Sequence, residues 1–361
     1  MYVKTLNLKS FRVYDSIKLS FNPNTNIIIG NNGQGKTTIL ESLYVLGLTK
    51  SHKTNTDKEL IKNSANFAKI NSVINLNNKD MELDITLSKV GKKAKYNHIE
   101  FLKLSEYIGK LNVVMFAPED LELVKGNPQN RRKFLDLEIG QISKNYLTGL
   151  QKYKKALKER NSLLKTMQKS KDKNMVLLDV VTDQLVVNID SIVTNRKEFI
   201  NKISNFANEK YKKLADDSFE LKIKYIPSIE TNFKEEHIKK YQYDIITGST
   251  SLGPHRDDVE FYLNGETVKN FCSQGEIRSV ILALKLALID FVYEYRGEYP
   301  ILLLDDVLSE LDDNRQNKLM GLLNNKTQTF ITTTQINEIK LDNISNYTVF
   351  SVFDGQIKER D

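Results

Sequence analysis

Polar and apolar positions alternate along several short segments of the chain and later change to a longer period. Alternation with a period of two predicts strands at Val3–Leu8, Ile17–Phe21, Lys69–Leu76 and Met81–Leu87, the last two joined by a turn over residues 77–80. Short apolar runs predict further strands at Ile27–Ile29, Asn112–Phe116 and Ile301–Leu304. From Arg131 to Leu214 the pattern is helical, with almost no Pro or Gly and no sustained heptads. An α/β fold with a helical insert and no long coiled coil is therefore expected.

This change of pattern sets the expected domain organisation. At 361 residues the chain is long enough for two lobes. Residues 1–125 and 246–361 are expected to form one α/β lobe in two parts, and residues 126–245 a helical second lobe.

Composition indicates the compartment. The single cysteine, Cys272, excludes an internal disulfide and a cysteine cluster for zinc, which favours a reducing cytoplasm. The first residues alternate in polarity, unlike a signal peptide. The most apolar later stretch, Val280–Val292, is short and carries Lys285 and Asp290, so no membrane span is expected. A cytoplasmic protein is the resulting expectation.

Charge is concentrated in the helical insert. The whole chain has a formal net charge of +7, whereas Gln129–Met175 alone holds 13 Lys or Arg against 4 Asp or Glu. Two interpretations remain open, a solvated helical face or a surface for a nucleic-acid phosphate backbone. The residues considered for the second are Lys144, Lys152, Lys155, Lys158 and Arg160, with Tyr146 and Tyr153.

The segment GNNGQGKTT follows the apolar run at Ile27–Ile29 and precedes a segment with helical periodicity. It comprises Gly30, Asn31, Asn32, Gly33, Gln34, Gly35, Lys36, Thr37 and Thr38. A strand, a glycine-rich loop and a helix in this order are typical of a phosphate-binding loop, in which backbone amides and the helix N-terminus surround phosphate oxygens. Lys36 would then contact the β- and γ-phosphates, and the Thr37 hydroxyl would coordinate Mg²⁺. The alternative is a glycine-rich turn that matches the pattern by chance.

A second apolar strand ends in two carboxylates, Asp305 and Asp306. In phosphate-loop proteins the first carboxylate of such a strand holds Mg²⁺, which predicts that role for Asp305. Asp306 would act as the general base or orient the attacking water. The alternative is an acidic turn that closes a buried strand.

The segment Cys272–Glu276, CSQGE, begins a predicted helix. Ser273 followed three residues later by Glu276 forms a capping box, which by itself accounts for both residues. The functional alternative is that Ser273, Gln274 and Gly275 bind the γ-phosphate of a nucleotide held by another subunit.

Taken together, these three motifs, the run LLLDDVLSELDD at residues 302–313 and Phe330–Thr334 resemble the ABC-type ATPase heads of the SMC class. The resemblance is closest to the RecF family of bacterial recombination mediators and spans nearly the whole chain. The helical insert matches only in its general helical pattern. It implies an ABC-type ATPase head with a mixed sheet, a helical second lobe, and Arg12 near the nucleotide phosphates.

The resemblance further implies a cycle in which ATP and Mg²⁺ join two copies into a homodimer that grips DNA. The DNA would be gapped, junction or double-stranded, the protein would help to load recombinase, and RecR and RecO would be partners. A threonine, Thr333 or Thr334, replaces the histidine of many ABC ATPases, and Asp306 replaces a glutamate, so a weak, DNA-stimulated ATPase that acts as a switch is expected. The alternatives are an ATPase subunit of a membrane transporter and a small-molecule phosphotransferase.

Overall fold

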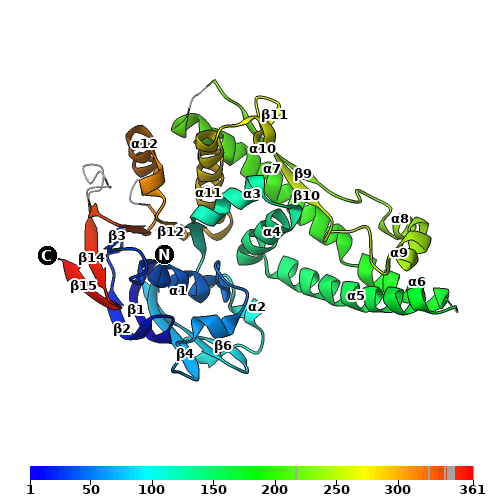
Figure 1. Cartoon of the computed structure of the whole chain (residues 1–361), viewed down its shortest axis with the longest axis horizontal. Helices are drawn as coiled ribbons and strands as arrows, with labels where there is room; N and C mark the ends of the chain where they lie inside the picture. Colours follow the sequence, from blue (N-terminus) through cyan, green and yellow to red (C-terminus); the bar gives the residue numbers. More distant parts are fainter. Residues whose placement is uncertain (172, 216–217, 324–325, 337–338, 340–345, 361) are drawn as a thin grey trace. The chain divides into compact units, whose positions relative to one another are not determined.

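In the computed structural model, which describes residues 1–171, 173–215, 218–323, 326–336, 339 and 346–360, the chain divides into two units (Figure 1). Unit 1 comprises Met1–Asp120, Glu209–Ser218 and Arg278–Asp361. Unit 2 comprises Leu121–Asn208 and Phe219–Ile277. Residues 246–277 therefore cluster with the helical unit, whereas the sequence pattern assigned them to the α/β lobe.

One sheet of unit 1 carries the two strands that precede the predicted nucleotide motifs. Its order is β15 (Gln356–Arg360), β14 (Tyr347–Phe353), β3 (Thr25–Ile29), β13 (Thr329–Thr333), β12 (Ile301–Asp305) and β8 (Val113–Phe116). All neighbours are parallel except β14 and β15. The carboxyl ends of β3 and β12 thus flank that of β13 at one edge of the sheet, where open α/β sheets bind their ligands.

The other sheet of unit 1 is antiparallel, in the order β2 (Tyr14–Ser20), β1 (Tyr2–Phe11), β4 (Phe67–Leu76), β5 (Lys79–Ser88), β6 (Gly91–Tyr96) and β7 (Ile99–Glu100). The predicted hairpin between β4 and β5 is confirmed, since Leu76 pairs with Lys79. Asn77 and Asn78 both have positive φ, 50° and 60°. Asparagine tolerates this left-handed conformation, which a two-residue hairpin turn requires.

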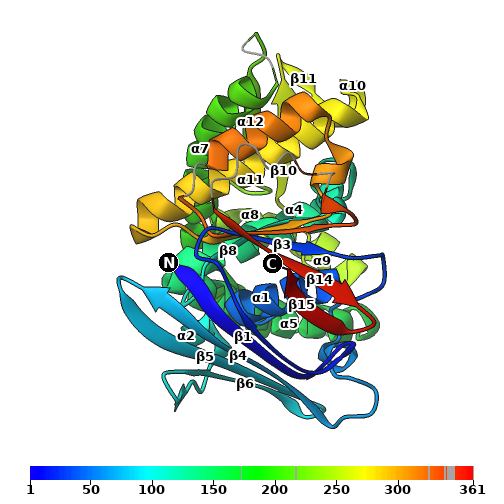
Figure 2. The same ribbon diagram turned by 90° about the vertical axis from the view of Figure 1, so that its left-hand side faces the viewer.

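Helix α1 (Lys36–Leu48) packs against strands of both sheets, β8, β12 and β13 on one side and β5 on the other. Figures 1 and 2 show it between the sheets. All its residues from Ile39 to Leu48 are buried. A helix enclosed on all sides must be apolar around its whole circumference. The run from Leu43 to Leu48 meets that need and fixes the helix beneath the predicted phosphate loop.

The remaining elements of unit 1 are η1 (Asp57–Leu60), α2 (Leu104–Tyr107), η3 (Leu308–Glu310) and α12 (Asp313–Leu323). Helix α11 (Gln274–Arg296) begins in unit 2 and continues in unit 1, η2 (Pro118–Leu121) begins in unit 1, and α7 (Ile189–Leu214) ends there. Among the described residues, no helix combines the length and the hydrophobicity that a membrane crossing needs.

Unit 2 combines helices with a small sheet. The helices are α3 (Glu122–Lys125), α4 (Pro128–Ile142), α5 (Lys144–Lys169), α6 (Met175–Val186), α8 (Phe233–Lys239), α9 (Tyr241–Thr247) and α10 (Val268–Phe271), with most of α7. The sheet consists of β9 (Leu221–Ile226), β10 (Asp258–Leu263) and β11 (Glu266–Thr267).

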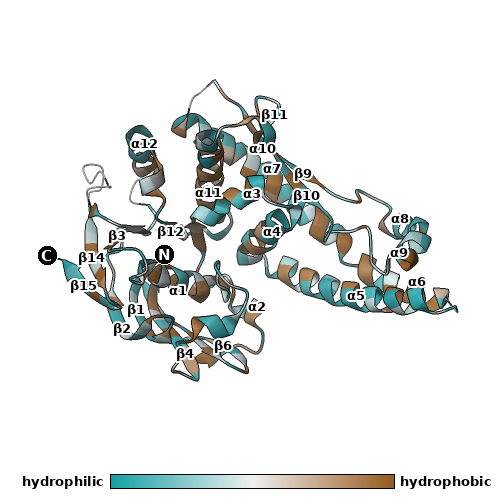
Figure 3. Ribbon diagram, in the orientation of Figure 1, coloured by the Kyte–Doolittle hydropathy of each residue, from teal (hydrophilic) through white to brown (hydrophobic). Residues whose placement is uncertain are grey.

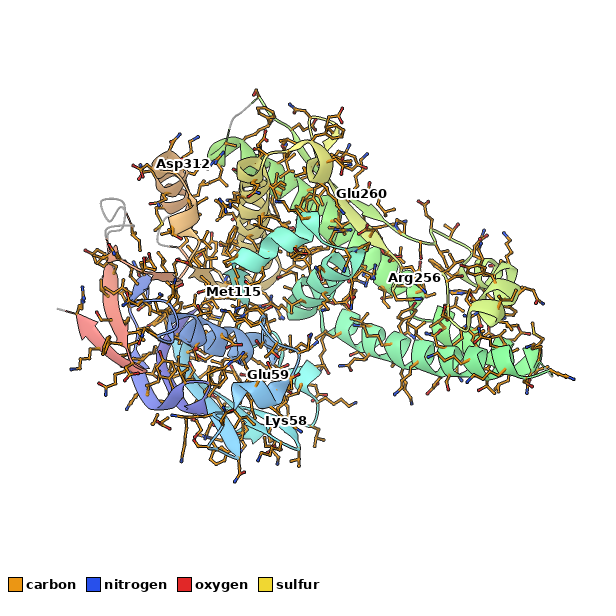
Figure 4. All side chains as sticks on the ribbon, viewed as in Figure 1. Lys58, Glu59, Met115, Arg256, Glu260 and Asp312 are labelled. Carbon is orange, nitrogen blue, oxygen red and sulfur yellow. The ribbon has the colours of Figure 1, made fainter. Side chains whose placement is uncertain are left out.

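Buried ion pairs hold the segment around β10 to the helices of unit 2. Arg131 of α4 contacts Asp258 at 2.6 Å, and Arg196 of α7 contacts Asp257 at 2.9 Å. The side chains of Arg196 and Asp257 are 2% and 0% exposed. Arg256, labelled in Figure 4, lies beside them in sequence and donates to the Thr250 carbonyl. Because a buried charge is costly unless it is paired, these contacts explain why residues 246–277 belong to this unit.

Three residues that the sequence analysis considered for a nucleic-acid surface are core residues instead. Tyr146 and Tyr153 are each 1% exposed, and Arg160 is 0% exposed. The Arg160 guanidinium contacts Asp244 at 2.8 Å and also donates to Thr182 and Thr250. Neither surface interpretation therefore holds for these three side chains, because they lie on the face of α5 that packs inward.

Candidate functional site

The loop between β3 and α1 adopts the conformation that its glycines permit. Gly35 has φ of +114°, and a Cβ there would lie 2.7 Å from the Tyr14 hydroxyl oxygen, which donates to the Gly35 carbonyl at 3.1 Å. Gly30 has φ of +154°, and a Cβ there would lie 2.4 Å from the Val352 carbonyl oxygen. Both positions exclude larger residues. The glycines are thus required by backbone geometry as well as by room for a ligand.

Lys36 lies inside this loop. The residue is 7% exposed, and its ammonium donates to the carbonyl oxygens of Gly30, at 2.5 Å, and Asn31, at 3.2 Å. The Asn32 side-chain oxygen lies 3.5 Å away. The loop therefore surrounds a fixed positive charge at the N-terminus of α1, where the helix dipole also favours an anion.

The rest of the loop is more exposed. Asn31, Asn32 and Gly33 are exposed at its tip, and Gln34 accepts a hydrogen bond from the Asp354 amide. Thr38 is half-buried and donates its amide to the Gly35 carbonyl at 3.1 Å. The tip of the loop is exposed and Lys36 is buried beneath it. The outer side of the loop is therefore accessible to a ligand.

Asp305, at the end of β12, lies beside the first turn of α1. The Thr37 hydroxyl donates to Asp305 Oδ1 at 2.8 Å, although the two residues are 268 positions apart in sequence. Thr332 of β13 donates to the same oxygen, also at 2.8 Å. The side chain of Asp305 is only 5% exposed. The structure thus brings together the hydroxyl and the carboxylate that the sequence analysis predicted to share a cation.

Asp306 follows immediately and has an unusual backbone. Its φ is +54°, in the left-handed region that few residues other than glycine adopt, and its amide donates to the Thr332 hydroxyl at 2.9 Å. The Ser309 hydroxyl lies 3.2 Å from the Asp306 carboxylate. The turn after β12 therefore gives the two neighbouring carboxylates different surroundings, a buried one for Asp305 and a half-buried one for Asp306.

Two basic residues of the loop after α1 approach the same carboxylate. The Lys53 ammonium lies 3.8 Å from Asp305 Oδ2. His52 packs edge-on against Tyr44, with ring centroids 5.3 Å apart, and burial lowers the pKa of its imidazole. The resemblance to the RecF family includes this loop and implies that His52 and Lys53 approach phosphate or DNA. That role stays a prediction.

Arg12 occupies a closed ion pair. Its guanidinium donates to both carboxylate oxygens of Glu41 on α1, at 2.9 and 2.7 Å, and to the Glu59 carbonyl at 3.0 Å. Glu59 is labelled in Figure 4. Bidentate pairs of this kind are strong and geometrically specific. Arg12 thus anchors α1, and its predicted contact with nucleotide phosphates stays a prediction.

The CSQGE segment belongs to unit 2 and forms the capping box that its spacing predicts. The Ser273 amide and hydroxyl both donate to Glu276 Oε2 at 2.7 Å, and the Glu276 amide donates back to the Ser273 hydroxyl at 3.3 Å. Ser273 and Gln274 are exposed, and Gly275 is half-buried. The helix start is therefore ordered by its own residues and presents its first turn to the outside.

Few described side chains could serve as cation ligands. Among the described residues, no group of three or more His, Cys, Asp or Glu side chains could by itself hold a metal ion. Mg²⁺ seldom occupies an all-protein cage, and it is usually held by one or two carboxylates together with phosphate oxygens and water. Thr37 and Asp305 fit this smaller donor set.

Comparisons with known proteins agree with this architecture. The family model described as the RecF/RecN/SMC N terminal domain matches residues 2–358. DNA replication and repair protein RecF of Bacillus subtilis (strain 168) is 45% identical over 368 residues, covering 99% of this chain and 100% of the relative. RecF of Latilactobacillus sakei is 43% identical over 371 residues and covers 99% of each.

Solved structures give the same result for the fold. A structure described as the recombination mediator protein RecF with ATP in the RecFOR pathway has a TM-score of 0.91 and 31% identity, over 100% of this chain and 98% of that one. An SMC head domain from Pyrococcus furiosus has a TM-score of 0.56 and 19% identity, over 99% and 96%. The second likeness concerns the fold alone. It nevertheless supports the expected ABC-type head with a mixed sheet.

Proposed function

The chain belongs to the family of RecF, RecN and SMC N-terminal domains, and from this premise we propose that it is an ATP-binding protein of DNA replication and repair. Its relatives at 43–45% identity over their full length are described as DNA replication and repair protein RecF, and a RecF structure 31% identical to this chain is described with ATP. The alternative of a transporter ATPase subunit finds no support among these relatives. A cytoplasmic location is part of the proposal.

The observation that carries the proposal is the contact between Thr37 and Asp305. A hydroxyl from the phosphate-loop helix and a carboxylate from a second strand meet at 2.8 Å, which is the pair that holds Mg²⁺ in phosphate-loop proteins. When bound, Mg²⁺ would neutralise negative charge that develops on the phosphates. Thr37 and Asp305 would supply its protein ligands.

Two further residues act on the triphosphate. Lys36 exchanges its contacts with the Gly30 and Asn31 carbonyls for phosphate oxygens, which are stronger acceptors because they are charged. Asp306 orients the attacking water and accepts its proton. The left-handed backbone at Asp306 supports this role, because strained positions are concentrated at active sites. An aspartate at position 306 instead of a glutamate, and Thr333 or Thr334 instead of the histidine of many ABC ATPases, make a slow ATPase that suits a switch.

Nucleotide binding is proposed to join two copies of the chain. Ser273, Gln274 and Gly275 lie at an accessible helix N-terminus in unit 2, and such a terminus attracts phosphate. In the proposed dimer this terminus of one copy covers ATP held by the other. The capping box orders the terminus in advance, so less entropy is lost on association. The dimer grips DNA and releases it after hydrolysis, with RecR and RecO as protein partners.

The test is sedimentation of the full chain with ATP and Mg²⁺, with and without duplex DNA. We expect a monomer without nucleotide and a dimer with ATP. The variant Asp306→Asn keeps the size of the side chain and removes the base, so it should bind ATP and accumulate as the dimer. A wild-type chain that stays monomeric under saturating ATP, or an Asp306→Asn variant with unchanged hydrolysis, would contradict the proposal.

A further inference from the structure

Helix α5 carries a row of lysines on the side opposite its buried face. Its buried residues are Tyr146, Leu150, Tyr153, Ala156, Arg160, Leu164 and Met167. Lys144, Lys155, Lys158, Lys165 and Lys169 are all exposed and are called the lysine stripe below. At 3.6 residues per turn they fall within an arc of about 80°, centred opposite the buried residues. Figure 3 shows the resulting mixture of teal and brown along α5.

The stripe is nearly free of neutralising charge. It extends over the 26 residues of one uninterrupted helix, which at a rise of 1.5 Å per residue places its ends about 37 Å apart. Glu159 is the only acidic residue of α5, and it lies 3.9 Å from Lys155. The other four lysines have no carboxylate within ion-pair distance among the described residues. Lys154, outside the stripe, is by contrast paired with Asp136 at 2.8 Å.

The groups between the lysines are short and polar. Gln151 and Ser162 are exposed within the same arc, with Thr148 and Thr166 at its edge. Hydroxyl and amide groups beside lysine are the side chains that contact phosphate oxygens in nucleic-acid complexes. None of the exposed large hydrophobic residues of the described chain belongs to α5. The stripe therefore lacks the apolar anchors that a bilayer or a protein partner would need.

The absence of exposed aromatic side chains on α5 also distinguishes between forms of nucleic acid. Proteins that hold single strands stack bases on aromatic rings as well as contacting the backbone. A row of lysines without such rings can contact only phosphates. A duplex presents them densely, with one charge per about 1.7 Å of axis.

We propose that the lysine stripe of α5 is the surface along which unit 2 binds the phosphate backbone of a nucleic-acid duplex, independently of base sequence. This inference rests on the proposed function, since it assumes that the chain binds DNA, and adds where and how it does so. It also changes the set of residues that the sequence pattern indicated for a phosphate-backbone surface. Arg160, Tyr146 and Tyr153 are buried, whereas Lys165 and Lys169 join Lys144, Lys155 and Lys158.

The experiment compares two triple variants of the full chain. Lys158→Gln, Lys165→Gln and Lys169→Gln together remove three charges from the stripe. Lys89→Gln, Lys93→Gln and Lys103→Gln remove the same charge from exposed positions in unit 1. Binding of a labelled duplex and of a single strand of equal length is measured by anisotropy over a salt series, with ATP present. ATP affinity and thermal unfolding serve as checks of the fold.

For the stripe variant, we expect the slope of log affinity against log salt to fall by about 2.7, because each lost phosphate contact removes about 0.9. With equal affinities at 1 M salt, this change of slope corresponds to about a 500-fold loss of duplex affinity at 0.1 M salt. The control variant should lose much less.

Three results would overturn the stripe while leaving the proposed function intact. These are an unchanged slope in the stripe variant, an equal loss in the control, or a loss confined to the single strand. A wild-type chain that binds no DNA under any of these conditions would instead overturn the proposed function itself.

Discussion

Replacing Asp305 by asparagine tests the cation site most directly. Asparagine has nearly the same size, and its amide oxygen can still accept from Thr37 and Thr332, the two hydroxyls now 2.8 Å from Oδ1. The variant therefore removes the charge and keeps the packing. In the wild-type protein, Mg²⁺ should raise the affinity for ATP. A carboxylate that coordinates such an ion contributes several kcal/mol to the interaction. A loss of about 3 kcal/mol corresponds to about 100-fold.

The assay is a fluorescent-nucleotide titration in Mg²⁺ and in EDTA, for wild type, Asp305→Asn and Asp306→Asn. The ratio of the nucleotide affinity in Mg²⁺ to that in EDTA should fall about 100-fold in Asp305→Asn. In Asp306→Asn, the matched control, this ratio should stay near the wild-type value. The free energy of unfolding of Asp305→Asn should differ from wild type by about 1 kcal/mol. Hydrogen bonds to a neutral amide oxygen are weaker, but the cost of burying a charge is also removed. An Asp305→Asn variant that is folded and keeps the wild-type ratio would refute the assignment.

The remaining predictions concern the loop, the helix start and acid stability. Lys36→Ala should weaken ATP binding at least 100-fold in calorimetry with little change in unfolding temperature, and micromolar binding would contradict the site. Gly275→Arg should leave ATP binding intact and abolish ATP-induced dimers in sedimentation; persistent dimers would leave the capping box as the segment's whole role. Burial lowers the pKa of His255 to about 4, below the 6.5 of an exposed histidine. Its contribution to the free energy of unfolding is therefore complete above pH 6.5 and declines by at most about 3 kcal/mol as pH falls toward 4. In urea unfolding, His255→Gln should reduce this pH dependence, and His237, whose pKa burial also lowers to about 4, should account for part of what is left.

The strands, the phosphate loop and the main helical insert could be predicted because their signals are local. Period-two alternation identified β4 and β5, and the spacing from Gly30 to Thr37 identified a loop whose conformation depends on a few neighbouring residues. The capping box of Ser273 and Glu276 was likewise confirmed from four consecutive residues. Each of these features depends on interactions within one segment, so the sequence contains the whole signal.

The unit boundary and the burial of inward-facing basic residues were not predicted, because both depend on partners that are distant in sequence. Residues near 257 belong to unit 2 through an ion pair between Arg196 and Asp257 that crosses 61 positions. Arg160 is buried because Asp244 meets it from 84 positions away. From sequence alone, a basic residue within a run of basic residues is expected to be exposed. Helical periodicity could have indicated the burial of Arg160, since it falls on the same face as Tyr146 and Leu164.

Two buried carboxylates near α1 show how partner chemistry separates a structural role from a functional one. Burial opposes the ionisation of Glu41, but hydrogen bonds from Arg12 and Ser51 outweigh it and lower the pKa of this carboxyl. A guanidinium that occupies both oxygens leaves no room for a cation. Asp305 is held instead by two hydroxyls, which can rotate and use their own oxygens as ligands. Of the two, only Asp305 can therefore accept a divalent ion without losing a charged partner that lies within hydrogen-bond distance.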